Sequence, residues 1–222
     1  MDVDDPLHAT LLASAPIYDV LFSCLSPLSL TRLAMTCRAA YLAVAKFKRR
    51  AYNINRHFSR YFTNPIAFRS LQAKTNTLVS GSNALQFLDR TFYPEADLDL
   101  YTHPRHSFEV AQFLVEIEGY RYVPRHTQRQ DWKAAVNIPL DLLERRVVPR
   151  GNTNHAYPVT IIRAVWTFEK PGVDQECLKV QIIEGWASPF EAILGFHSST
   201  FVLSVLMFSG MLSIVASPQH AS

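Results

Sequence analysis

Two acidic residues separated by a single leucine, Asp97 and Asp99, are the groups whose types and spacing point most directly to chemistry. On a strand, this alternation sends both carboxylates to one face and the intervening apolar side chains to the other. Like charges a few ångströms apart disfavour joint ionisation unless a cation lies between them. Mg²⁺ binds one or two protein carboxylates together with substrate phosphate oxygens. The pair therefore predicts a site for Mg²⁺ or Mn²⁺, with a solvated edge strand as the alternative interpretation.

The elements that must position these acids are a strand, a turn and a helix that precede them in the chain. Thr77–Val79 is β-prone, Gly81 permits a sharp turn, and Ser82 can cap the helix that follows. A helix that begins in this way offers backbone N–H groups to phosphate oxygens. We therefore expect Gly81 and Ser82 to bind the phosphate oxygens of a substrate and Asp97 and Asp99 to bind metal.

This order of motifs resembles the signature of the nucleotidyltransferase fold, the DNA polymerase beta superfamily. The matching segments are Val79-Ser80-Gly81-Ser82 and Asp97-Leu98-Asp99-Leu100. The resemblance implies that the glycine–serine turn holds the phosphates of a nucleoside triphosphate and that the two acids hold Mg²⁺ or Mn²⁺. The spacing between the two segments is slightly longer than is usual in that family.

A predicted β-hairpin, formed by 159–168 and 178–183, bears on whether such a domain is catalytic. In active members of that family the returning strand supplies a third carboxylate that helps to deprotonate the attacking hydroxyl group. Gln181 stands at the aligned position, and an amide neither takes up a proton nor adds charge to a metal pair. Glu184 lies three residues further on and is expected on the opposite face of the strand.

An N-terminal segment has apolar residues with helical spacing after Pro16, namely Leu21, Leu25, Leu30 and Leu33, followed by Thr36-Cys37-Arg38. This pattern resembles an F-box, the three-helix motif that docks onto the Skp-type adaptor of SCF ubiquitin ligases. The residues that the resemblance implies as partner-binding are Pro16, Leu21, Leu25, Leu30 and Leu33. The segment departs from the motif at Ala15, where leucine is usual, and in its first acidic residue, which arrives only at Asp19. A helical lid that packs on the following domain is the alternative interpretation.

The predicted fold class is α+β, an N-terminal F-box-like helical module followed by a small mixed-sheet nucleotidyltransferase-like domain. The expected divisions are a flexible leader over 1–13, the helical module over 14–64, the nucleotidyltransferase-like domain over 65–198 and an apolar segment over 199–222. Further elements predicted are helices over 66–76, 107–118 and 190–196 and a strand over 120–123. The last segment is a packed helix, a tail anchor or an altered end, and we expect no membrane association.

Composition narrows the possible functions further. Hydrophobic residues make up 48% of the 222 residues, which is enough for a substantial core, and the net charge of +3 gives no strong nucleic-acid signal. Three scattered cysteines predict a reducing compartment and no zinc site. Because the N-terminus is acidic, we expect no secretory signal and an intracellular protein of the cytoplasm or nucleus.

Three functions remain open at this point. The first is an F-box-like protein whose degenerate nucleotidyltransferase-like domain binds nucleotide and Mg²⁺ and is weakly catalytic or not catalytic. The second is an active nucleotidyltransferase that moves a nucleotidyl group from a nucleoside triphosphate to a hydroxyl acceptor. The third is a substrate-recruiting adaptor of a ubiquitin ligase. Over about residues 15–198, the chain resembles uncharacterised fungal proteins in which an F-box-like segment precedes such a domain.

Overall fold

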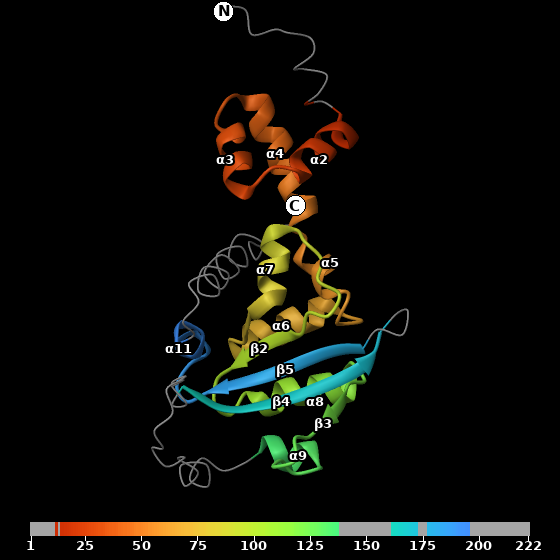
Figure 1. The fold of residues 1–222 in the computed structure, drawn as a ribbon, viewed down its shortest axis with the longest axis vertical. Helices are drawn as coiled ribbons and strands as arrows, with labels where there is room; N and C mark the ends of the chain where they lie inside the picture. Colours follow the sequence, from red (N-terminus) through yellow and green to blue (C-terminus); the bar gives the residue numbers. More distant parts are fainter. Residues whose placement is uncertain (1–11, 13, 138–160, 173–176, 196–222) are drawn as a thin grey trace, which may run out of the picture. The chain divides into compact units, whose positions relative to one another are not determined.

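The computed structural model describes residues 12, 14–137, 161–172 and 177–195, and it has a mixed α+β fold (Figure 1). The chain divides into two compact units, which are described separately below. The first unit comprises Met1–Phe58 and Gln86–Phe92, and the second comprises Ser59–Leu85 and Tyr93–Ser222. The predictions for the leader, apart from residue 12, and for the apolar segment 199–222 lie outside the described residues.

The first unit is helical. Its elements are α2 (Ala15–Ser23), α3 (Pro27–Ala34), α4 (Arg38–Ala51) and α5 (Ile54–Phe58). Helix α3 begins at a proline, whose missing N–H costs nothing at a helix start, and the hydroxyl of Ser26 accepts a hydrogen bond from the Ser29 N–H at 3.1 Å. This cap and the preceding turn separate α3 from α2.

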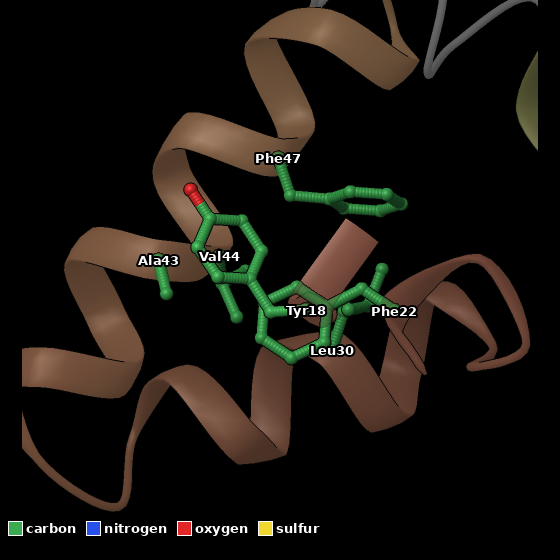
Figure 2. Close-up of a cluster of buried hydrophobic side chains, with 6 residues drawn as sticks. All are labelled: Tyr18, Phe22, Leu30, Ala43, Val44 and Phe47. Atoms are coloured by element: carbon green, nitrogen blue, oxygen red, sulfur yellow. The ribbon is translucent and has the colours of Figure 1, made fainter. Parts of the chain in front are cut away.

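The core of the first unit is a cluster of aromatic and aliphatic side chains from α2, α3 and α4 (Figure 2). Its members are Tyr18, Phe22, Leu30, Ala43, Val44 and Phe47. The rings of Phe22 and Phe47 meet edge to face with centroids 5.6 Å apart. Arg90 also belongs to this unit, since its guanidinium donates to the backbone carbonyls of Phe22 and Leu25 and lies over the Phe47 ring. The helices are thus held together partly by a residue that follows them by many positions.

The second unit is built on a five-stranded mixed sheet with the order β1-β2-β5-β4-β3 (Figure 1). The strands are β1 (Leu78–Ser80), β2 (Leu98–Thr102), β3 (Arg121–Val123), β4 (Ile162–Pro171) and β5 (Cys177–Gly185). The central pair, β2 and β5, is parallel, and the other neighbouring pairs are antiparallel. The hairpin predicted between the last two strands is confirmed.

The helices of the second unit are α6 (Pro65–Thr75), α8 (Ser107–Gln112), the π-helix η1 (Phe113–Ile117), α9 (Trp132–Val136) and α11 (Pro189–Leu194), while α7 (Gly81–Asp89) begins in this unit and ends in the first. The sequence predicted a single helix over 107–118, whereas the structure changes from α-helix to π-helix at Phe113. The other predicted helices in the described range are confirmed to within a few residues. None of the helices among the described residues is long and apolar enough to cross a membrane.

The two faces of the central strands differ in chemistry. Leu98, Leu100 and Ile182 are fully buried on one face. The alternate residues of β2 place Asp99 and Tyr101 on the other face, where Tyr101 packs with Ile183 and with residues of α11. The Asp99 end of this face lies beyond that apolar cluster and carries the polar residues of the candidate site.

Candidate functional site

Gly81 makes the turn between β1 and α7 and lies directly against Asp99. Its φ of +77° is one that residues with a side chain rarely adopt. A Cβ atom at this position would collide with Oδ2 of Asp99 and lie 3.2 Å from its Cγ. Only glycine therefore allows both the turn and the close approach of the carboxylate, and the sequence-predicted turn and acid are brought together.

Asp99 is the less solvated of the two acids. Its pKa is raised from 3.8 to about 7, chiefly because burial disfavours the charged form and further because Asp97 is negatively charged nearby, while the Lys179 ammonium opposes the rise. Among the described residues, nothing donates a hydrogen bond to its carboxylate. The chain therefore holds a carboxylate in a place where its ionised form is poorly stabilised.

Ser80 lies beside Asp99 in the sheet. The two residues are directly paired across the antiparallel strands β1 and β2, so that their side chains project from the same face. Ser80 is 1% exposed, and its hydroxyl oxygen has no hydrogen-bond partner within the described part of the chain. Buried hydroxyl groups are normally hydrogen-bonded, so that an orphan beside an unpaired carboxylate marks a place where a ligand would satisfy both.

Asp97 has different surroundings. It lies one residue before β2 begins, and its Oδ2 accepts hydrogen bonds from Lys179 Nζ at 2.7 Å and from Gln181 Nε2 at 3.1 Å. Gln181 is directly paired with Asp99 across the parallel strands. The predicted acids thus lie close together on one face, but one is neutralised by a cation of the chain and the other is not.

The position opposite Asp99 on β5 is held by the amide of Gln181. Glu184 is paired instead with Thr102, and it is buried with its carboxylate bonded to Arg163 and to the Ser107 hydroxyl. Burial raises the pKa of Glu184, while these two partners lower it. Glu184 therefore supplies no third carboxylate to the acidic pair. Within the described ranges, no group of three or more His, Cys, Asp or Glu side chains could hold a metal ion.

Ser82 does not act as the expected helix cap. It is exposed in the first turn of α7, which begins at Gly81, and its hydroxyl makes no hydrogen bond with any described residue. The cap prediction is wrong because the helix already begins at Gly81, so that Ser82 lies within its first turn and not before it. The Ser82 hydroxyl remains exposed to solvent at the Gly81 turn.

The residues predicted to bind a partner through the helical unit fall into two groups. Pro16 and Leu21 are exposed, with Leu21 at 51%. Leu25 and Leu33 are partly buried against the core, and Leu30 is fully buried within it. Additional exposed apolar side chains that the sequence analysis did not single out are Ile17, Val20, Leu28, Met35, Tyr41 and Leu42.

Sequence reasoning also missed Lys179 and Ser80. The signal for Lys179 was its spacing of two residues from Gln181, which places both side chains on the same face of a strand. The signal for Ser80 was its position directly before the turn glycine. Both needed the strand register, which the sequence alone does not supply.

Comparison with known proteins gives no match: no family model, no curated protein and no solved structure matches this chain.

Proposed function

We propose that the second unit binds a nucleoside triphosphate together with Mg²⁺ or Mn²⁺, and that it is weakly catalytic or not catalytic. The observation that carries the proposal is the Asp99 carboxylate, which is poorly solvated, receives no hydrogen bond from the described residues and lies against the Gly81 turn. A carboxylate in this state is stabilised by a divalent cation, and Mg²⁺ keeps phosphate oxygens among its ligands.

The turn supplies a place for those phosphates. Gly81 brings the backbone close to the carboxylate, and α7 starts there with N–H groups that have no partner within the helix. The helix dipole adds a partial positive charge at the same end. A phosphate held there would lie within reach of a cation on Asp99, which is the arrangement that the resemblance to nucleotidyltransferases implies.

The amide at Gln181 favours binding over transfer. It stands beside the acids and donates a hydrogen bond to Asp97, so that it occupies the place of a base without being one. Loss of a general base costs about two to four powers of ten in rate. The alternative, an active transferase, requires another base, and it predicts release of pyrophosphate when a nucleoside triphosphate and a hydroxyl acceptor are supplied.

A thermal-shift titration with each nucleoside triphosphate, with and without Mg²⁺ or Mn²⁺, tests this proposal. A ligand at a hundred times its dissociation constant stabilises the folded protein by about 2.7 kcal/mol, which raises the midpoint by about 5–10 °C for a chain of this length. We expect a rise that the metal enhances and that is lost in the variant Asp97→Ala/Asp99→Ala. No shift with any nucleotide, or an equal shift in the double variant, would rule the nucleotide site out.

A second candidate function concerns the first unit, where several large apolar side chains are exposed. Val20 is 67% exposed and Leu21 51%, both on α2, and large exposed apolar side chains on one helix are available to a partner. Their presence favours the adaptor-docking role that the resemblance to an F-box implies.

For the docking role, we expect Leu21→Asp to abolish binding to a purified Skp-type adaptor. Because Leu21 is half-exposed, the substitution should change the free energy of unfolding by less than about 1 kcal/mol. The matched control is Ile66→Asp, which introduces the same charge at an exposed apolar position of α6 in the other unit. Failure of the unaltered protein to bind the adaptor, or equal binding by Leu21→Asp, would exclude this function.

A further inference from the structure

The ion pair between Lys179 and Asp97 distinguishes this site from a simple pair of metal-binding acids. The Lys179 ammonium lies 2.7 Å from Oδ2 of Asp97, and the amide of Gln181 donates to the same oxygen. The two charged side chains are only 35% and 29% exposed. The pair is therefore partly shielded from water, where ionic contacts are stronger than on an open surface.

The Lys179 ammonium weakens the ability of Asp97 to bind a metal ion. A divalent cation on Asp97 would have to displace Lys179 or lie within a few ångströms of another positive charge, and either change opposes binding. A carboxylate shared with a lysine is also a weaker ligand, since part of its charge is already compensated. The ion pair with Lys179 thus makes Asp97 a poor ligand for a metal ion.

Asp99 and Ser80 remain as oxygen ligands. The two side chains project from one face of neighbouring strands, and neither has a hydrogen-bond partner among the described residues. Ser80 is 1% exposed, so that its hydroxyl has no solvent to bind. An ionised carboxylate and a hydroxyl oxygen, with water or phosphate oxygens, suit a single hard divalent cation.

We propose that Lys179 is a tethered cation that takes the place of one metal ion, so that the site binds a single divalent cation at Asp99 and Ser80. The Lys179 ammonium then supplies the second positive charge to an anionic ligand. The part that concerns the anion rests on the proposed function, in which that ligand is a nucleoside triphosphate. The part that concerns metal stands on the contacts of Lys179, Asp97, Asp99 and Ser80 alone.

Calorimetric titration of the full chain with Mn²⁺, without nucleotide, tests the metal part. We expect Lys179→Met to bind Mn²⁺ at least tenfold more tightly than the unaltered chain, because Asp97 then joins Asp99 as a ligand. The matched control is Lys74→Met, which removes the same charge from an exposed position of α6 and should leave the affinity unchanged. Equal or weaker binding by Lys179→Met, or no binding by either protein, would overturn the proposal.

A second variant tests the ligand set independently of Lys179. Ser80→Ala removes a buried hydroxyl that has no partner, so that folding is not endangered. We expect it to weaken Mn²⁺ binding severalfold in the Lys179→Met background, where binding is tightest. Unchanged affinity would show that Ser80 is not a ligand and would overturn that part of the assignment.

A thermal-shift experiment with ATP distinguishes the role of Lys179 from the proposed nucleotide-binding function. In EDTA, the unaltered chain should keep a small thermal shift with ATP that Lys179→Met loses, because the ammonium is the remaining cation. A shift that Lys179→Met retains in EDTA would overturn the second role of Lys179. If ATP causes no shift under any condition, the proposed function fails, while the Mn²⁺ titration still decides whether Lys179 replaces a metal ion.

Discussion

Replacing Glu118 by alanine is expected to lower the free energy of unfolding of the second unit by about 3–5 kcal/mol. The Glu118 side chain is 0% exposed, and it accepts hydrogen bonds from the backbone N–H groups of Thr63 and Asn64 at 2.7 and 3.3 Å. It also pairs with Lys170, whose ammonium lies 3.4 Å away and is 14% exposed. The substitution leaves a largely buried ammonium and two backbone donors without their acceptor, which is the costly way to break such a network.

Urea unfolding measures this effect. With an m-value of about 2 kcal/mol per molar urea, the midpoint should fall by about 2 M. The control is Glu116→Ala, which removes an acid from the adjacent π-helix η1, where its partners Gln112 and Lys133 are on the surface. Surface ion pairs contribute little, so the control midpoint should not move measurably. Midpoints that fall equally in both variants would contradict a large contribution of the buried Glu118 contacts to stability.

The sequence predicts the elements around the site because their signals are local. Gly81, with its preference for positive φ, marks the turn, and the Asp-Leu-Asp-Leu alternation marks a strand with both acids on one face. The hairpin and most of the helices follow from apolar spacing and from prolines at helix starts. These local signals suffice to place Gly81 and Asp99 in contact once the two strands pair.

The contacts that could not be predicted from the sequence are those between segments that are distant in the chain. The ion pair of Lys179 with Asp97 depends on the register of β2 against β5. The buried position of Glu184 depends in addition on the register of β4 against β5 and on the placement of helix α8. The contribution of Arg90 to the helical core joins residues that are far apart in the chain. None of these contacts leaves a periodic trace in the sequence, because each is set by long-range packing.

The exposure of the predicted partner-binding leucines also could not be predicted from the sequence. Apolar spacing marks Leu30 and Leu21 as equivalent helix positions, yet Leu30 is fully buried and Leu21 is 51% exposed. Periodicity identifies the apolar face of a helix. How much of that face neighbouring helices cover depends on how α2 packs against α4. Which leucines are available to a partner is therefore visible only in the structure.

Asp99→Asn should stabilise the protein at alkaline pH. The pKa of Asp99 is raised in the folded state, so that its protonated form is favoured there, and the associated stability is present below about pH 4 and lost as the pH rises through about 7. Asparagine has no charge to lose. We expect the variant and the unaltered protein to be similar near pH 4 and the variant to be more stable by about 2–4 kcal/mol at pH 8.

Thermal or urea unfolding across pH 4–9 measures this difference, and Asp89→Asn, at the exposed end of α7, is the control for loss of one negative charge. Mg²⁺ should add stability to the unaltered protein at pH 8 and not to Asp99→Asn, because only the former keeps a carboxylate for the cation. A variant that is no more stable than the unaltered protein at pH 8 would mean that the ionised Asp99 is well stabilised within the chain. In that case the carboxylate would have no need of a cation, and the main support for a metal-dependent nucleotide site would be lost. If the variant is stabilised as expected, the folded chain keeps an unfavourable charge at Asp99 beside the Gly81 turn. Binding of a cation that compensates this charge would explain why the chain keeps it.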